Sequence, residues 1–169
     1  MSLESLAQKI ARGDERAFEE LYNKVRQAVY SVCLGIVRAH MTAEELMQDT
    51  FVTVWTHSGE FKGNSYKAWI LTIAKNKSLN HLKKQAHEIP VDFLENDDIG
   101  YYESDMALGV TVRAALDSLD PIERQIVLLR NSGVKAKEIA EYLGIARGTV
   151  SWKYAEAFKK LKKYMEGTE

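Results

Sequence analysis

Apolar positions recur along most of this chain with the three- and four-residue spacing of amphipathic α-helices. Between residues 15 and 38 they form one continuous stripe, made of Phe18, Leu21, Tyr22, Val25, Val29 and Val32. The alternation of apolar and polar residues that marks a half-buried strand is hard to find. The pattern therefore predicts an all-α protein.

Local start and stop signals divide this pattern into separate helices. Thr42 and Glu45 have the spacing of a capping box and predict the start of a third helix. Asp120 and Pro121 form another start signal, with an acidic N-cap and a proline at the first helical position. The predicted helices cover residues 3–11, 15–38, 42–56, 66–85, 106–118 and 121–131, followed by a C-terminal helical pair.

Charge is distributed unevenly over these helices. The chain has a formal net charge of −1, yet residues 61–87 contain six lysines and no carboxylate, with Phe61, Tyr66 and Trp69 among them. Lysines can follow the phosphates of a single-stranded nucleic acid while aromatic rings stack on its bases. The simpler interpretation is a solvated helix face, which is preferred for a charge run alone. A second nucleic-acid motif further along the chain changes that balance.

The second motif is AKEIAEYLGIARGTVSWKY, residues 136–154. Its small residue Ala140, glycine Gly144 and β-branched Val150 have the spacing of a helix-turn-helix, in which Gly144 can adopt the positive φ that ends the first helix. The second helix, from about Gly148, is expected to bury Val150, Tyr154, Phe158, Leu161 and Met165. Its outer face would offer a major groove Arg147, Ser151, Trp152, Lys153 and Glu156. An ordinary helical hairpin is the alternative.

Residues 89–105 separate the two motifs and differ from both in composition. This segment contains six carboxylates and no Lys or Arg, is interrupted by Pro90 and Gly100, and shows no clear period. We therefore predict an acidic linker there, joining a helical domain at 1–88 to a second helical domain at 106–169.

Other function classes lack their motifs in this sequence. We expect no catalytic residues, metal or cofactor, because there is no nucleophile turn or phosphate loop, and no metal-ligand spacing involves the four histidines, His40, His57, His81 and His87. The single cysteine, Cys33, lies in an apolar run and is predicted to be a buried thiol. With no signal-peptide core and no apolar run long enough for membrane insertion, we expect a cytoplasmic protein.

Three segments in this order resemble bacterial RNA polymerase sigma factors of the extracytoplasmic-function (ECF) type, in the sigma-70 superfamily. The segments are AEELMQDTFVTVW at 43–55, SYKAWILTIAKNKSLNHLKK at 65–84 and the helix-turn-helix at 136–154, and the resemblance covers nearly the whole chain. It implies an alternative sigma factor that binds core RNA polymerase and directs promoter-specific transcription initiation. Residues 1–88 would bind polymerase and melt the −10 element, and residues 106–169 would read the −35 element.

The resemblance also implies roles for individual residues. The polymerase-binding helix would use Gln48, Asp49, Thr50 and Phe51, the first three of which are expected to face outward. Recognition of the −10 element would use Phe61, Tyr66, Lys67, Lys75, Asn76, Asn80, Lys83 and Lys84. Recognition of the −35 element would use Arg147, Gly148, Thr149, Ser151, Trp152 and Lys153, with Lys159 and Lys160 as further phosphate contacts.

Three positions depart from the family pattern. Asn80 stands where many relatives carry an acid, and Glu156 and Phe158 stand where relatives often carry arginine. An amide can both donate to and accept from a base edge, so Asn80 should alter base preference without abolishing binding. We expect Phe158 to pack inside the domain.

The resemblance further implies promoter DNA and a separate anti-sigma factor as partners. It also suggests that the acidic linker threads the basic channels of the polymerase, although a flexible, solvated spacer explains the composition equally well. The competing function is a stand-alone helix-turn-helix regulator that binds duplex operator DNA. That hypothesis accounts for residues 106–169 but leaves the lysine-rich segment and QDTFVTVW unexplained.

Overall fold

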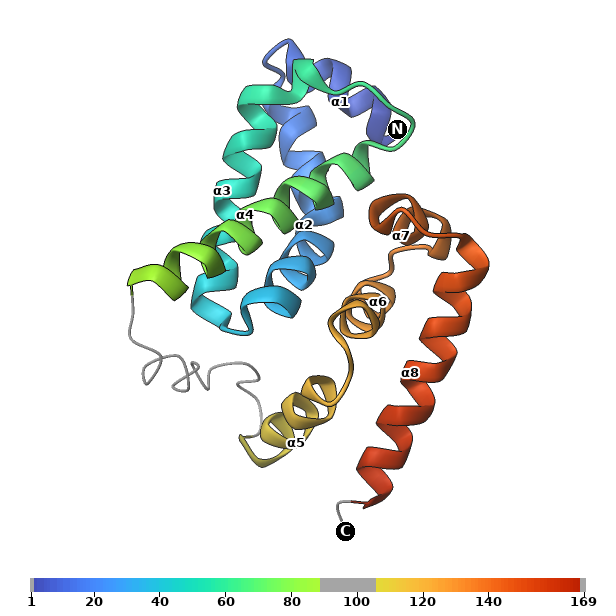
Figure 1. The fold of residues 1–169 in the computed structure, drawn as a ribbon. Helices are drawn as coiled ribbons and strands as arrows, with labels where there is room; N and C mark the ends of the chain where they lie inside the picture. The colour runs from blue at the N-terminus through green and yellow to red at the C-terminus, as the bar shows by residue number, and fades with distance from the viewer. Residues whose placement is uncertain (1, 89–105, 168–169) are drawn as a thin grey trace.

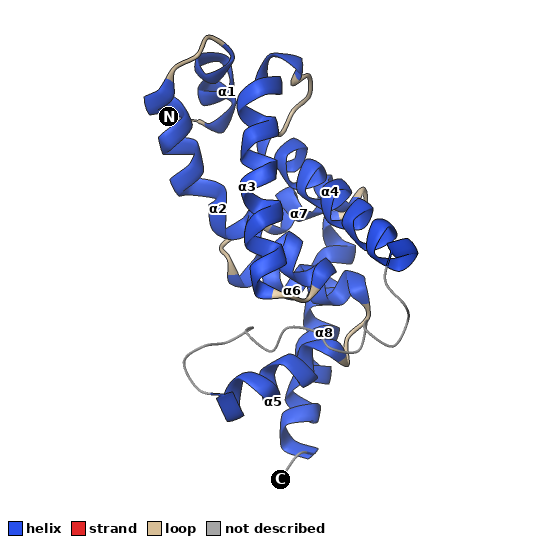
Figure 2. Ribbon diagram, turned by 90° about the vertical axis from the view of Figure 1, so that its left-hand side faces the viewer, coloured by secondary structure: helices blue, strands red, loops and turns tan. Residues whose placement is uncertain are grey.

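The computed structural model describes residues 2–88 and 106–167, apart from the side chains of 87–88 and 106–111. Every regular element in these ranges is a helix, so the all-α prediction is confirmed (Figure 2). In chain order the elements are α1 (Leu3–Ala11), α2 (Glu15–Val37), α3 (His40–His57), η1 (Ser58–Glu60), α4 (Tyr66–Glu88), α5 (Met106–Asp117), α6 (Pro121–Asn131), α7 (Ala136–Leu143) and α8 (Arg147–Gly167). The predicted acidic linker at 89–105 lies outside the described residues.

The starts of α6 and α3 show that a helix can be begun by a local capping motif or by a contact with another helix. At α6 the Asp120 side chain accepts from the Glu123 backbone and the Glu123 side chain accepts from the Asp120 backbone, which is the expected capping box. At α3 the capping box predicted for Thr42 is wrong, since the helix begins at His40 without a side-chain cap. His40 Nδ1 lies 2.6 Å from the Tyr30 hydroxyl of α2, so a tertiary contact holds this helix start.

The N-terminal domain, α1 to α4, is built around α2. This helix packs against α3 and α4, and the stripe seen in the sequence is buried in its core, with Leu21, Val25, Val29 and Val32 all fully enclosed. Burying a side chain of this size contributes about 1.5–3 kcal/mol, so this stripe is a main source of stability for the domain. At one edge Phe18 meets Trp55 of α3 with ring centroids 5.2 Å apart.

The C-terminal domain, α5 to α8, contains the helix-turn-helix as α7 and α8. Gly144 ends α7 with φ of 70° and donates its N–H to the Ala140 carbonyl, as the motif predicts. Ile126, Ile139 and Val150 are fully buried between the helices. The spacing of small, glycine and β-branched residues therefore forms the hairpin expected from it.

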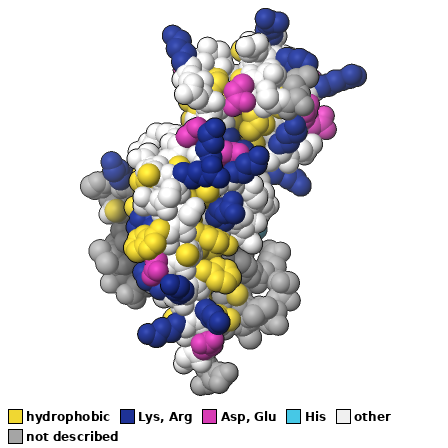
Figure 3. Space-filling model, turned by 90° about the vertical axis from the view of Figure 1, so that its right-hand side faces the viewer, with side chains coloured by type: hydrophobic (Ala, Val, Ile, Leu, Met, Phe, Trp, Pro, Cys, Tyr) yellow, Lys and Arg dark blue, Asp and Glu magenta, His cyan; other side chains and the backbone are white. Residues whose placement is uncertain are grey.

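The inner face of α8 differs from the prediction at two positions. Val150 and Ala157 are buried, but Phe158 is 57% exposed and Met165 is 41% exposed, so the expectation that these two pack inside is wrong. The buried face follows residues 150, 154, 157 and 161, and residue 158 is one position, about 100°, further round the helix. Figure 3 shows hydrophobic side chains exposed on the side of the molecule that carries α8.

The two domains pack against each other and share one hydrophobic cluster. In Figure 1, α6 and α7 lie against α2 and α4, and direct contacts join both pairs. Gly35 of α2 allows the close approach of α6, because a Cβ at this position would lie 3.2 Å from Leu128 Cδ1. The sequence did not predict this contact between domains.

Candidate nucleic-acid and protein interfaces

The outer face of α3 carries two of the four residues expected to bind polymerase. Gln48 and Asp49 are exposed, whereas Thr50 is fully buried and donates its hydroxyl to the Leu46 carbonyl at 2.7 Å. The prediction that Thr50 faces outward is therefore wrong. Thr50 shares its face of the helix with Leu46 and Val54, and that face is the one packed into the core.

Phe51 contributes instead to an apolar groove between α2 and α3. The groove has a volume of about 470 Å³, and its lining is mostly apolar: Phe18, Tyr22, Phe51, Val52 and Trp55, with Glu15 and Gln48 beside them. Val52 is 63% exposed. A concave apolar surface with polar neighbours is typical of a protein-binding site. Sequence reasoning missed Val52, and it counted Phe18 and Tyr22 only as core residues.

The loop before α4 does not present Tyr66 to solvent. This residue is fully buried, its hydroxyl shares a hydrogen bond with Ser58, and its ring lies 5.0 Å from Phe61 and 5.5 Å from Trp69 between centroids. Burial raises the pKa of Tyr66 above its ordinary value. The expectation that Tyr66 contacts promoter bases therefore fails in this arrangement, because α4 begins against α1, where Glu4 accepts from the Tyr66 N–H.

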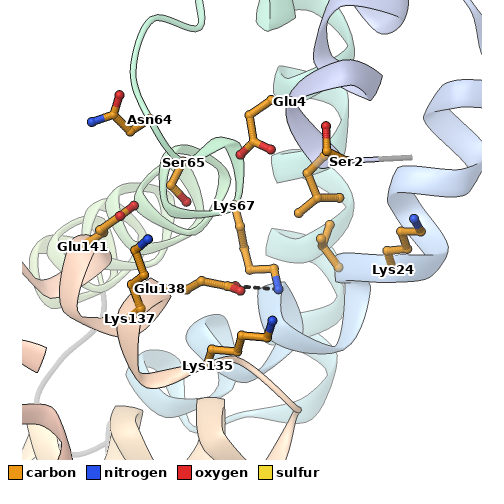
Figure 4. Close-up of a pocket in the computed structure, with 12 residues that line it drawn as sticks. Ser2, Glu4, Lys24, Asn64, Ser65, Lys67, Lys135, Lys137, Glu138 and Glu141 are labelled. Carbon is orange, nitrogen blue, oxygen red and sulfur yellow. Dashed lines mark ion pairs between the residues drawn. The ribbon is translucent and has the colours of Figure 1, made fainter.

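The remaining −10 candidates on α4 fall into two groups. Four are exposed along the helix, and these are Asn76, Asn80, Lys83 and Lys84. The other two contact the C-terminal domain: Lys67 Nζ lies 2.6 Å from Glu138 Oε2 (Figure 4), and Lys75 Nζ lies 5.3 Å from the centre of the Tyr142 ring. All six residues therefore lie on one helix, but only the first four are exposed to solvent.

The start of α8 presents the −35 candidates together. Arg147, Gly148, Ser151 and Trp152 are exposed, while Thr149 and Lys153 are half-buried. Trp152 is 62% exposed, which is high for so large an apolar side chain. The first two turns of α8 therefore combine a cation, a hydroxyl group and an aromatic ring among their exposed side chains.

Further along α8, the lysines predicted to grip phosphates already have acidic neighbours. Lys160 Nζ lies 2.9 and 3.0 Å from the two carboxylate oxygens of Glu123, which is a buried residue of α6. This hydrogen bond raises the pKa of Lys160. Lys159 lies 3.4 Å from Glu156 on the surface of the same helix. Lys160 therefore joins α8 to α6, and its ammonium group is not left free to contact a phosphate.

Residues 2–88 and 106–167, the part of the chain that the structure describes, contain neither a candidate metal cluster nor a membrane-spanning helix. No group of three or more His, Cys, Asp and Glu side chains there could hold a metal ion. No helix within the same ranges has the length and apolar character needed to cross a bilayer. Cys33 is buried as predicted, and burial raises its pKa to about 11.

Comparison with known proteins gives matches over both domains. Residues 21–88 match the family model described as Sigma-70 region 2, and residues 110–161 match the model described as Sigma-70, region 4. The RNA polymerase sigma-H factor of Pseudomonas aeruginosa is 26% identical over 164 residues, which cover 87% of this chain and 85% of that protein. The ECF RNA polymerase sigma factor SigE of Mycolicibacterium smegmatis is 27% identical over 167 residues, covering 92% of this chain and 65% of that relative.

A solved structure is similar in fold. The sigma factor RpoE in complex with the anti-sigma factor NepR, from Bartonella quintana, superposes with a TM-score of 0.70 at 24% identity, covering 88% of this chain and 96% of that one. The family predicted from the three sequence segments is therefore confirmed, in preference to a stand-alone regulator. This chain belongs to the sigma-70 family as an extracytoplasmic-function sigma factor, which directs transcription initiation by RNA polymerase.

Proposed function

We propose that the chain binds core RNA polymerase through the α2–α3 groove and the exposed residues Gln48 and Asp49 beside it. The observation that carries this proposal is the groove itself, in which Val52 and Trp55 offer apolar surface to solvent and the buried Phe51 forms part of the lining. Burial of such surface supplies affinity, while a charge at the edge selects a partner of opposite sign. Thr50 has no part in this contact, because it lies inside the domain.

For the domains, we propose that residues 1–88 bind polymerase and engage the −10 element, while residues 106–169 read the −35 element. The acidic segment 89–105 would connect the two. This division fits the positions of the candidate residues, since the exposed amides and lysines lie on α4 and the exposed first turn of the recognition helix lies on α8.

At the −10 element, Asn76 and Asn80 are the proposed base-reading residues of α4, with Lys83 and Lys84 on the phosphates. Both amides are exposed on the helix, and an amide side chain can donate to and accept from an unpaired base. Phe61 is half-buried, so part of its ring is accessible to a captured base. Tyr66 supports this loop from inside by its hydrogen bond to Ser58.

At the −35 element, Arg147 and Ser151 are the proposed base-reading residues and Trp152 an apolar contact. Side chains at the start of a recognition helix reach base edges, and the backbone N–H groups of its first turn favour a phosphate. Lys153, half-buried beside them, would hold the backbone of the duplex.

We also propose that a separate anti-sigma factor controls this chain, which would act in the cytoplasm with polymerase and promoter DNA. The similar RpoE structure contains its anti-sigma factor NepR, and that arrangement supports the proposal. The exposed apolar residues Trp152 and Phe158 of α8 offer surface to such a protein partner.

Replacing Asp49 with lysine tests the polymerase contact. Reversing a charge at a desolvated interface should weaken binding to core polymerase by about 2–3 kcal/mol, or roughly 30- to 150-fold in Kd. Glu45→Lys is the matched control, because Glu45 is exposed one turn earlier on α3 and its replacement reverses the charge in the same way. Affinity that stays unchanged in Asp49→Lys, or falls equally in both variants, would remove this surface from the proposal.

A further inference from the structure

A buried carboxylate of α6 holds Lys160 of α8. The Lys160 Nζ atom lies 2.9 and 3.0 Å from the two carboxylate oxygens of Glu123, whose side chain is only 4% exposed. Glu123 Oε1 also accepts from the Asp120 N–H at 3.2 Å, so the capping box at the start of α6 fixes the carboxylate in place. A charge removed from water needs such partners, and hydrogen bonds between a cation and a carboxylate are stronger than neutral ones. The contact therefore ties α8 to a fixed point on α6.

Lys160 points in a different direction from the proposed base-reading residues of the same helix. Ser151 and Lys160 are nine positions apart, and at about 100° per residue they lie on opposite sides of α8. A duplex read by Arg147 and Ser151 would therefore lie on the side of the helix away from Lys160. Lys160 faces α6 instead, where its ammonium group meets Glu123.

Contacts near opposite ends of α6 fix the direction of α8. Near the end of α6, the guanidinium carbon of Arg130 lies 5.7 Å from the centre of the Tyr154 ring. Near its start, Glu123 holds Lys160, which is six residues, or about 9 Å, further along α8 than Tyr154. Between these two points α8 buries Ala157, whose single methyl group makes a small apolar contact. Loss of the Lys160 contact would therefore loosen the angle between α6 and α8.

The angle of α8 matters because its first two turns carry the residues proposed to read the −35 element. A side chain that reads a base must be held within about 0.5 Å and 10–20° of its productive geometry. Since α8 is a helix of 21 residues, about 31 Å long, it carries a tilt at Lys160 to the entry angle of Arg147 and Ser151. Phosphate contacts tolerate such a tilt better, because a flexible lysine side chain can follow the backbone of the duplex.

We propose that Lys160 is a positioning residue for −35 recognition: through Glu123 it sets the angle of α8, and thereby the sequence specificity of promoter binding, without touching DNA. This inference rests on the proposed reading of the −35 element by Arg147 and Ser151. A lysine on a phosphate would strengthen binding to every sequence and would make it more dependent on salt. A positioning lysine instead changes the ratio of affinities for the correct and the incorrect sequence.

Holoenzyme binding to promoters with a matched and a mismatched −35 element tests the proposal. One mismatched base pair should weaken binding of the wild type by about 5- to 150-fold. In Lys160→Met we expect this ratio to fall at least about threefold, because the helix angle is loosened, while the slope of log affinity against log salt stays unchanged. Lys160→Arg should restore the ratio, since a guanidinium group can donate to both carboxylate oxygens. Lys162→Met is the matched control: it removes the same charge from an exposed position about 200° round the helix, away from Glu123, and should keep the wild-type ratio.

A double-mutant cycle shows whether Lys160 acts through Glu123. Glu123→Gln keeps the size of the side chain and an oxygen for the Asp120 N–H, but it removes the charge opposite Lys160 and should itself lower the ratio. In that background, Lys160→Met should change the ratio by less than about twofold, because the contact is already lost. The double variant also leaves no buried charge unpaired, so it remains informative if Lys160→Met alone unfolds. Circular dichroism confirms that each variant is folded at the temperature of the binding assay.

Two outcomes would overturn the proposal. A wild-type ratio in the folded double variant would show that the contact between Lys160 and Glu123 does not set specificity. Equal losses of affinity on both elements in Lys160→Met, with a salt slope smaller by about one unit, would make Lys160 a phosphate contact. If the wild type itself does not distinguish the matched from the mismatched element, the proposed −35 role of α8 fails instead, so the two failures can be told apart.

Discussion

Tyr66→Phe separates a structural role for this residue from a role at the DNA. The substitution deletes one oxygen atom and keeps the ring between Phe61 and Trp69. The lost hydroxyl is the hydrogen-bond partner of Ser58, and both residues are buried, with exposed fractions of 0% for Tyr66 and 4% for Ser58. The variant therefore leaves a serine hydroxyl without its partner inside the domain.

The expected loss follows from that unpaired group. Leaving a buried hydrogen-bonding group unsatisfied costs about 1–3 kcal/mol, while the ring still buries its apolar area. For a chain of this length, each 1 kcal/mol lowers Tm by about 2–4 °C, so a fall of roughly 2–12 °C is expected. Removing both partners, as in Ser58→Ala with Tyr66→Phe, should restore much of the loss, because no donor or acceptor is then left unpaired.

Urea unfolding followed by circular dichroism measures the change in the free energy of unfolding. Promoter melting by the holoenzyme, at a temperature where both proteins are folded, should be the same for Tyr66→Phe and the wild type. The reasoning would be refuted if stability were unchanged while promoter melting fell. That result would mean that the Tyr66 hydroxyl acts on DNA and that its burial is not the functional arrangement.

Three further predictions concern α4, α8 and the start of α6. Asn80→Ala should reduce the yield of open promoter complex several-fold while leaving the affinity for core polymerase intact. Permanganate footprinting and a titration with core polymerase measure these two quantities. Unchanged melting on every promoter would place base capture elsewhere. Arg147→Ala should cost about 1–3 kcal/mol on a preferred −35 element and less on a mismatched one, and equal losses in DNA-binding titrations would make Arg147 a phosphate contact. At Asp120, burial disfavours the charged form but is outweighed by hydrogen bonds from Glu123 and the nearby Lys153 and Lys160, so the pKa is lowered. Ionised Asp120 therefore stabilises the fold above its unfolded pKa of about 3.9, and this stabilisation is lost as pH falls through the lower folded pKa. Asp120→Ala should lower the free energy of unfolding by about 1 kcal/mol near neutrality and should show a smaller loss of stability in acid than the wild type. Urea titrations at about pH 7 and about pH 3 measure this, and an equal difference between variant and wild type at both pH values would contradict it.

The sequence by itself determined the helical class, the family and the local geometry of the helix-turn-helix. Helical periodicity located α2, and the residues Ala140, Gly144 and Val150 identified the hairpin, because their roles depend on backbone conformation and on packing between neighbouring helices. The start of α6 was equally predictable, since Asp120 and Glu123 form their capping box within four residues. Local interactions of this kind are encoded in short segments.

Only the tertiary structure decided which side of each helix remains accessible. Thr50, Tyr66 and Phe158 were each assigned to the wrong environment, because periodicity gives the angle between side chains on a helix but not which neighbouring helix each face will meet. The pairing of Lys67 with Glu138 joins residues far apart in the sequence, and it depends on the packing of two domains through Gly35. Contacts of that range follow from how complementary surfaces fit together, and the packing of the two domains of this sigma factor is their result.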